Sequence, residues 1–380
     1  MKNCWNRVLA LFFAVTFCVG TLGYAAEATN TRVIAPEDSV SASLDTRIED
    51  FVSAKISALQ LDIRISNVRH VVDFAGNDYV VVECSPTGYF IIHPASGTIT
   101  EYSTSAVSPF SAYPEGSVLV YGGPTYYYTY QNETYLHTVI DENLPRELVA
   151  QAMQVCSDAN EEMLSRPVTA MVNYLSGNQT LEQTISPDSA STNNVRLSGA
   201  DNLISGYSWF RNRSTNFGYI DGNCCGYVAA NLVLKFHHDY RRTISLPNAY
   251  SSNTSTALTT KLREYGSSNT TTAMSITTVI NEFAADHGIP QAASYALLGV
   301  GALQELDTYD RPCIMFGNIP NPNPNASSVG IAHAVVLYGY NYYENEGHTT
   351  YIVHFGWNGY SEVHVNGLDA TWGSNAKYKV

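Results

Sequence analysis

Apolar residues recur at helical spacing immediately after a pair of adjacent cysteines. From Gly226 to Phe236 the apolar side chains return every three or four residues, which predicts a helix with one buried stripe. Cys225 therefore stands at the N-terminal end of that helix. Similar patterns predict further helices at Thr46–Leu61, Pro145–Leu164, Ala257–Tyr265 and Ser275–His287.

Short apolar runs bounded by polar residues mark the strands. Early in the chain they lie at Asp78–Glu83 and at Gly88–His93, and a tyrosine-rich stretch, Tyr121–Tyr130, follows them. Near the C-terminus, Ile331–Tyr340 and Thr349–Trp357 flank a polar turn, which predicts a β-hairpin. Such a hairpin brings the end of its second strand close to the start of its first. We expect a fold of the α+β class.

The composition predicts two domains joined by an exposed linker. The 380 residues exceed what one hydrophobic core usually serves. Ser176–Asp201 is rich in Ser, Thr, Asn and Gln and has few large apolar residues, as exposed linkers do. We therefore expect a smaller α+β domain at residues 27–175, a linker at 176–200, and a second domain at 201–380 that carries all of the candidate chemistry.

The N-terminus has the layout of a secretory signal peptide. Lys2 and Arg7 precede an apolar run from Val8 through Val19, and small residues follow it. The run is too short, and polar sequence follows too soon, for a membrane span. We expect residues 1–26 to be removed and the protein to be released into the medium or the periplasm.

Charge and cysteine content suit an exported globular protein. Charged residues make up 14% of the sequence, against about 25% in average proteins. The net charge of −14 argues against nucleic acid or an anionic membrane as a partner, because either needs a basic face. An odd number of cysteines outside the cell implies at least one free thiol. The cysteines beyond the signal are Cys84, Cys156, Cys224, Cys225 and Cys313.

Cys225 and His333 are the candidate nucleophile and base. At a helix N-terminus the unpaired N–H groups and the helix dipole stabilise a thiolate, and a nearby imidazolium lowers the thiol pKa further. Gly226 leaves room for a substrate carbonyl to approach. His333 lies near the start of the predicted hairpin, where burying a histidine without a partner is costly. Each residue also has a purely structural interpretation, Cys225 as a small buried hydrophobe and His333 as a satisfied core histidine.

No cofactor or metal is indicated. His237 and His238 are adjacent, so on a helix they face different directions, and no cysteine or acidic cluster shares a ligand spacing with them.

The order of these motifs resembles the papain-like cysteine peptidases, most closely their secreted bacterial streptopain-like branch. The matching strings are CCGYVAANLVLKFHH at Cys225, RPCIMFGN, AHAVV at His333 and HFGWNG. The resemblance selects Cys225 over Cys224 as the nucleophile. It implies a papain-like catalytic domain in which the nucleophile helix packs on an antiparallel sheet. It also implies a preceding pro-domain that blocks the cleft until proteolysis.

The chain departs from the family pattern at two positions. The asparagine that orients the family's base aligns with His354, and Asn358 is the alternative. Trp357 matches the tryptophan that shields that hydrogen bond.

The glutamine that completes the family's oxyanion hole aligns with Tyr219, and Asn216 and Asn223 are alternative donors. Loss of such a donor typically costs about 10²–10³ in rate.

The sequence therefore predicts a cysteine peptidase made as a zymogen, with a protein or peptide as substrate and its own pro-domain as an intramolecular inhibitor. Two other functions use the same fold. One is a cell-wall amidopeptidase, and the other is a catalytically inactive binding protein, which the two departures favour.

Overall fold

The computed structural model describes residues 38–185, 201–213, 224–252, 256–266, 271–297, 301–317, 333–343, 348–367 and 372–380. The chain divides into two compact units, Met1–Ser41 and Ala42–Val380. Within the second unit, residues 42–185 are called the N-terminal part and residues 201–380 the C-terminal part. The predicted signal peptide lies outside the described residues. Within the described residues, no helix has the length and apolar character needed to cross a membrane.

The N-terminal part is a set of strands with helices before and after them. The strands are β1 (Arg64–Val72), β2 (Asp78–Ser85), β3 (Tyr89–His93), β4 (Thr98–Ser103), β5 (Leu119–Tyr121), β6 (Tyr127–Gln131) and β7 (Thr134–His137). The helices are α2 (Asp38–Ala58), α3 (Arg146–Ser165), α4 (Thr169–Leu175) and α5 (Leu181–Thr184).

The C-terminal part begins mainly with helices and ends mainly with strands. The helices are α6 (Tyr207–Arg211), α7 (Cys225–Phe236), the π-helix η1 (His237–Arg241), α8 (Asn248–Ser251), α9 (Ala257–Tyr265), α10 (Ala273–Asp286) and α11 (Ala302–Asp307). The strands are β8 (Asn202–Leu203), β9 (Ala293–Leu297), β10 (Cys313–Gly317), β11 (Ala334–Tyr343), β12 (His348–His354), β13 (Val363–Asn366) and β14 (Trp372–Tyr378).

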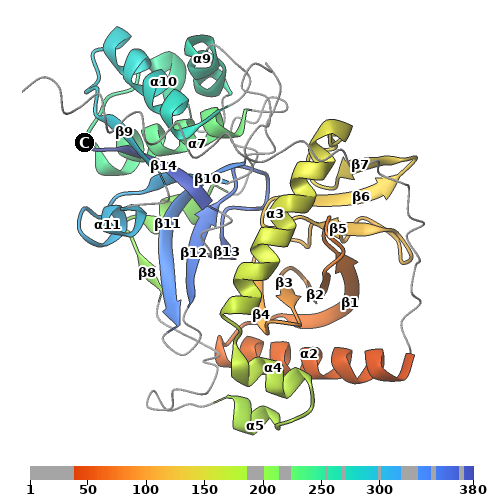
Figure 1. Ribbon diagram of the computed structural model, residues 1–380. Coiled ribbons are helices and arrows are strands. Elements are labelled where there is room, and N and C mark those ends of the chain that lie inside the picture. The colour runs from red at the N-terminus through yellow and green to blue at the C-terminus, as the bar shows by residue number, and fades with distance from the viewer. Residues whose placement is uncertain are drawn as a thin grey trace, which may run out of the picture. The chain divides into compact units, whose positions relative to one another are not determined.

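One sheet runs through both parts (Figure 1). Its strand order is β7-β6-β5-β1-β2-β3-β4-β13-β12-β11-β10-β14-β9, and β8 pairs with β11. The described pairs are antiparallel except for β1 with β5. The two parts join where β4 pairs with β13, with Tyr102 opposite His364 and Glu101 opposite Val365. The fold is thus mixed α+β, as the sequence predicts.

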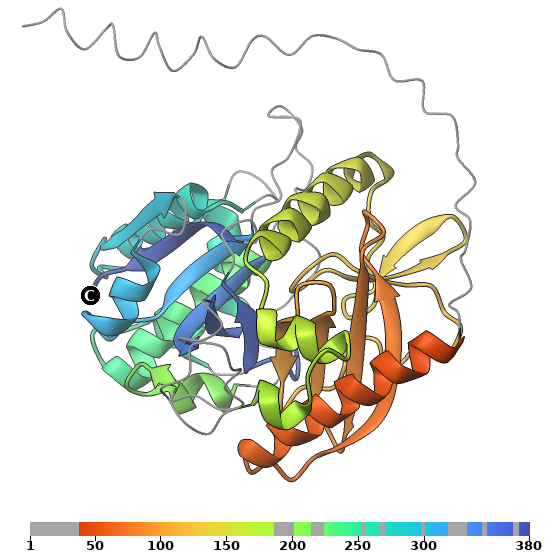
Figure 2. The same ribbon diagram turned by 60° about the horizontal axis from the view of Figure 1, so that its bottom comes forward.

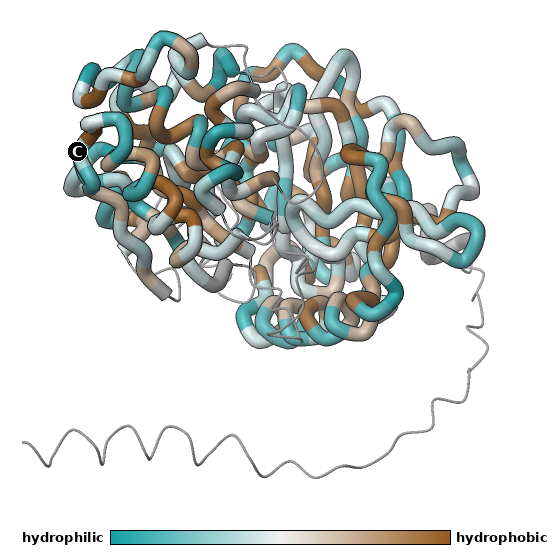
Figure 3. Tube along the Cα trace, turned by 90° about the horizontal axis from the view of Figure 1, so that it is seen from above, coloured by the Kyte–Doolittle hydropathy of each residue, from teal (hydrophilic) through white to brown (hydrophobic). Residues whose placement is uncertain are grey.

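The middle strands of the N-terminal part are buried on both faces. In β2, Val80 and Val82 pack in one cluster with α2 and α4, whereas Tyr79 and Val81 belong to the core that includes the C-terminal part. Figure 2 shows α2 and α4 on the outer side of these strands. Burial on both faces explains why this strand reads as a continuous apolar run. In Figure 3 the hydrophobic positions accordingly gather along the strands, with hydrophilic ones on the outer turns.

The helix α7 lies at the centre of the C-terminal part. It contacts β10 and β11 on one side and α9 and α10 on another. All of its residues are buried, so the single buried stripe predicted from the sequence is wrong. The two polar residues on the stripe's far side find partners. Asn231 donates to Oγ1 of Thr259 at 2.8 Å, and Lys235 donates to the carbonyl of Ser252.

Most predicted elements form close to their expected bounds, and the hairpin of β11 and β12 is confirmed. The predicted linker is described only to Ile185, and its first residues include the short helix α5. A capping box starts this helix: Gln183 N donates to Oγ1 of Thr180, and Thr180 N donates to the Gln183 side chain. The segment just after Leu175 is therefore ordered, although its composition reads as linker.

Candidate active site

Cys225 is the first residue of α7. Cys224 occupies the N-cap position, and its side chain makes no capping hydrogen bond. The N–H groups of the first turn therefore lie next to the Cys225 sulfur, as the sequence predicts for a thiolate at a helix start. The side chain is 9% exposed.

His333 directly precedes β11. Its Nε2 lies 2.9 Å from the carbonyl oxygen of Phe355, just after β12. A carbonyl oxygen can only accept, so Nε2 carries the proton and Nδ1 is the acceptor in the neutral ring. Burial lowers the pKa of His333 from 6.5 to about 4, and the bond to Phe355 opposes that shift. Near neutral pH the ring is thus an uncharged base with a defined tautomer.

The sulfur of Cys225 contacts the peptide that follows His333. Burial raises the pKa of the thiol. Hydrogen bonds from the N–H of Ala334, the hydroxyl of Thr271 and the N–H of Gly226 act in the opposite direction. The Oγ1 of Thr271 lies 3.9 Å from the sulfur. Within the described residues, the ring of His333 bonds to the carbonyl of Phe355 and no bond joins it to the sulfur, while its backbone bonds to Tyr126 and to the N–H of Gly317.

Tyr126 of the N-terminal part reaches into this centre. The N–H of His333 donates to its hydroxyl oxygen at 2.8 Å. Burial raises the pKa of Tyr126, the bond from His333 opposes that rise, and the charge of Cys225 adds to it. A Cβ added at Gly317 would lie 3.1 Å from the same hydroxyl. The phenol therefore lies between the peptide of the candidate base and β10, where the charge of Cys225 acts on it.

Trp357 covers the ring of His333 and is itself covered by the N-terminal part. Its ring lies 4.5 Å from that of His333 and 5.3 Å from that of His137. Its Nε1 is buried without a hydrogen-bond partner among the described residues. The tryptophan thus lies where the sequence comparison expects a shield for the base.

The structure does not bring His354 to the ring of His333. Nε2 of His354 donates to the carbonyl of Arg213 at 2.8 Å, and its Nδ1 accepts from the N–H of Gly356 at 2.9 Å. Both ring nitrogens are therefore used. The alternative, Asn358, lies exposed in a turn. The carbonyl of Phe355 occupies the position expected for the orienting side chain, and no side-chain motif could have revealed a backbone group.

The three oxyanion candidates, Tyr219, Asn216 and Asn223, lie outside the described residues. The same holds for the loop Asn318–Gly330 that leads to His333.

Among the described residues, the remaining cysteines and histidines form no second centre. None of the five cysteines in the described part of the chain is in a disulfide. Across the same residues, no group of three or more His, Cys, Asp or Glu side chains is arranged to hold a metal ion. His287 follows α10 as its C-cap, and Gly288 after it has φ +64°, so this pair ends the helix as the sequence predicts.

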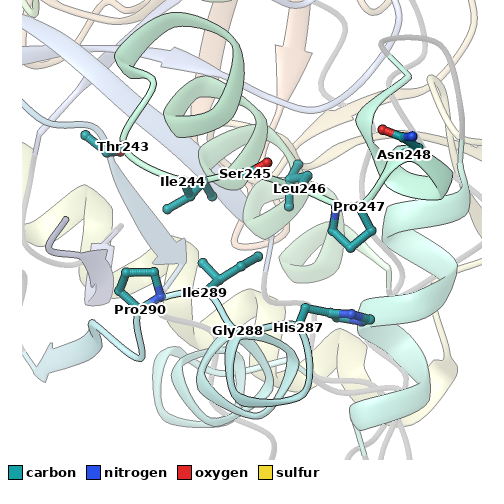
Figure 4. A pocket seen from close by; sticks show the side chains of 10 residues that line it. All are labelled: Thr243, Ile244, Ser245, Leu246, Pro247, Asn248, His287, Gly288, Ile289 and Pro290. Atoms are coloured by element: carbon teal, nitrogen blue, oxygen red, sulfur yellow. The ribbon is translucent and has the colours of Figure 1, made fainter.

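A pocket of about 640 Å³ lies away from the candidate residues. Figure 4 shows its two walls, formed by residues 243–248 and 287–290. The first wall follows η1, beyond the C-terminal end of α7, whereas Cys225 is at the N-terminal end of that helix. The pocket is therefore separate from the candidate active site.

No protein-family model matches the sequence, and no curated protein matches it. Among solved structures, a fragment of prointerpain A from Prevotella intermedia is similar, with a TM-score of 0.34 and 12% sequence identity. The alignment covers 82% of this chain and 98% of that chain.

Proposed function

We propose that this chain is the precursor of a secreted, papain-like cysteine peptidase. In this proposal Cys225 is the nucleophile and His333 the base. The N-terminal part is an inhibitory pro-domain that is released by cleavage between residues 176 and 200. The observation that carries the proposal is the position of Tyr126 of the N-terminal part, whose hydroxyl accepts a hydrogen bond from the backbone N–H of His333 and interacts electrostatically with Cys225.

The proposed reaction uses His333 for each proton transfer. Nδ1 takes the proton from the Cys225 thiol, and the sulfur attacks the peptide carbonyl carbon. The backbone N–H of Cys225 and a donor from residues 214–223 stabilise the oxyanion. The protonated ring gives its proton to the leaving amine as the C–N bond breaks. Water, deprotonated at Nδ1, then attacks the thioester carbonyl carbon. The C–S bond breaks, the acid product leaves, and the protonated ring returns its proton to the sulfur.

Phe355 fixes the ring for this sequence of steps. Because its carbonyl holds the proton on Nε2, the lone pair of Nδ1 is kept available for the thiol proton. The same bond stabilises the imidazolium that forms after that transfer. A backbone carbonyl thus performs the function that a side-chain amide performs in the family.

The closed state keeps the two groups uncharged. Burial raises the pKa of the Cys225 thiol and lowers that of His333 to about 4. Both shifts favour the neutral thiol and the neutral imidazole over the ion pair. Withdrawal of Tyr126 admits water to this space, which weakens both shifts and favours the reactive thiolate.

A proteolytic activation experiment tests the proposal. Full-length protein is treated with a trace of exogenous protease, and the cut is mapped by mass spectrometry. Casein hydrolysis is then measured for wild type, Cys225→Ala and the matched control Cys224→Ala. We expect hydrolysis to start with the cut within residues 176–200, to be abolished in Cys225→Ala and to persist in Cys224→Ala.

The other outcomes separate the alternatives. Full activity of the uncut chain would refute the inhibitory pro-domain. Cys225-dependent turnover of peptidoglycan but not of casein would indicate a cell-wall amidopeptidase. A cut protein that neither hydrolyses casein or peptidoglycan nor reacts with iodoacetamide at Cys225 would indicate a catalytically inactive binding protein.

A further inference from the structure

Thr271 reaches Cys225 from an element that carries none of the other candidate residues. It lies two residues before α10, and its side chain is 5% exposed. A capping box fixes the start of the helix: Ser275 N donates to Oγ1 of Thr272 at 3.1 Å, and Thr272 N donates to Oγ of Ser275 at 2.8 Å. Thr271 is therefore held by a defined helix start, with Oγ1 3.9 Å from the sulfur.

Gly226 makes this approach possible. A Cβ at Gly226 would lie 2.5 Å from both Cβ and Oγ1 of Thr271. Gly226 has ordinary helical backbone within α7, so its conformation does not require glycine. Glycine inside a helix costs roughly 0.5–1 kcal/mol relative to alanine. The close packing of Thr271 over the first turn explains why a residue without a side chain follows the cysteine.

We propose that Thr271 is a positioning residue for the Cys225 thiolate. Its hydroxyl donates to the ionised sulfur and, together with the N–H of Ala334, holds it at the start of α7. A thiol and a hydroxyl can each donate to the other, but a thiolate can only accept. Ionisation therefore fixes the direction of this hydrogen bond and strengthens it.

The other titratable groups that face the sulfur come from different elements. Tyr126 directly precedes β6 and Tyr227 lies in α7, and the charge of Cys225 acts on both; the candidate base His333 directly precedes β11. The hydroxyl of Thr271 does not titrate, so its removal changes the ionisation of Cys225 without adding or removing a charge. This inference rests on the proposed function only in taking Cys225 as the nucleophile.

The test is the pH dependence of thiolate formation at Cys225. Thiolate absorbance in the ultraviolet is titrated in the full chain, with Cys225→Ala subtracted. The rate of Cys225 alkylation by iodoacetamide is followed by peptide mass spectrometry in the cut protein. Wild type is compared with Thr271→Val, which keeps the shape of the side chain, and with Thr271→Ser, which keeps the hydroxyl.

We expect Thr271→Val to raise the apparent pKa of Cys225 by about one unit, because a hydrogen bond to the charged form is lost. The alkylation rate near neutral pH then falls about tenfold, because it is proportional to the fraction of Cys225 present as thiolate. Thr271→Ser keeps the wild-type profile. Thermal melting shows whether each variant is folded, and if Thr271→Val is not, Thr271→Ala compared with Thr271→Ser provides the same comparison.

An unshifted profile in Thr271→Val would refute the positioning role, and so would a Thr271→Ser profile that matches Thr271→Val. Failure of the proposed function gives a different result. A Thr271-dependent profile without hydrolysis leaves the inference standing and refutes the peptidase. Cys225-dependent hydrolysis with an unshifted pH profile in Thr271→Val supports the peptidase and refutes the positioning role of Thr271.

Discussion

Glu101 is a buried carboxyl whose own contribution to stability we expect to depend strongly on pH between mildly acidic and neutral pH. Its carboxyl is completely buried in β4 and accepts hydrogen bonds from the hydroxyls of Tyr127, Tyr89 and Tyr121. Burial raises its pKa from 4.5 to about 7, and the three hydroxyls oppose that rise. Over this range the carboxyl is protonated in the folded protein but ionised in the unfolded chain.

The magnitude follows from the difference in pKa. A difference of about 2.5, at 1.36 kcal/mol per unit, corresponds to roughly 3 kcal/mol of the free energy of unfolding. Because the pKa is raised on folding, this stability is fully present below pH 4.5. It declines as the pH rises and is lost above about pH 7. Glu101→Gln replaces the carboxyl with an uncharged amide of similar shape and removes this dependence.

Urea denaturation followed by tryptophan fluorescence measures the effect. The free energy of unfolding of wild type minus that of Glu101→Gln is compared at pH 4.5 and pH 7.5. We expect the difference to fall by roughly 3 kcal/mol from the lower to the higher pH. Exposed Glu115, changed to Gln, is the matched control and is expected to follow wild type. A difference that stays constant, or increases with pH, would show that the reasoning is wrong.

Three further changes test the candidate active site. Tyr126→Ala removes the phenol beside Cys225, so iodoacetamide is expected to label Cys225 severalfold faster in the uncut chain. His354→Phe leaves one buried and one half-buried backbone group without their partner and is expected to lower the free energy of unfolding by about 2 kcal/mol, measured in urea. Gly226→Ala, which usually stabilises a helix, is expected to destabilise this one because the new Cβ meets Thr271.

Each of these changes has a control or an outcome that would contradict it. Tyr128→Ala, two residues from Tyr126, is expected to leave the labelling rate of Cys225 near that of wild type. An unchanged urea midpoint in His354→Phe would contradict the hydrogen bonds assigned to that ring. For Gly226→Ala, higher stability than wild type would show that Thr271 can move aside. Gly226→Ala combined with Thr271→Gly, which removes both contacting atoms, tests whether relieving the contact restores stability.

The sequence predicts those features of this fold that depend on local pattern. The periodicity of 226–236 gives α7 within one residue, and the polar turn between two apolar runs gives the β11–β12 hairpin. Both are set by neighbours in sequence. The full burial of α7 could not be predicted in this way, because Asn231 and Lys235 are polar residues typical of a solvent-facing side. Their partners, Thr259 and Ser252, are distant in sequence.

The contacts of the candidate site depend on residues distant in sequence and on the backbone. One of three consecutive tyrosines, Tyr126, reaches His333, and the run of aromatic residues does not show which one. The carbonyl of Phe355 has no side-chain signature. His354 aligns with the family's orienting residue, yet Arg213 and Gly356 take both of its nitrogens.

The pairing of β4 with β13 affects the behaviour of the cleaved protein. Neither strand has an open edge there, and cutting the chain between residues 176 and 200 leaves the ladder between Glu101–Tyr102 and His364–Val365 in place. Full separation of the N-terminal part from the C-terminal part would expose the N–H and C=O groups of β13 that pair with β4, and would expose Trp357. Unpaired strand edges of this kind recruit further chains. If the proposed cleavage released the N-terminal part, we would therefore expect the separated C-terminal part to be prone to aggregation, and the N-terminal part would also serve as its solubilising cover.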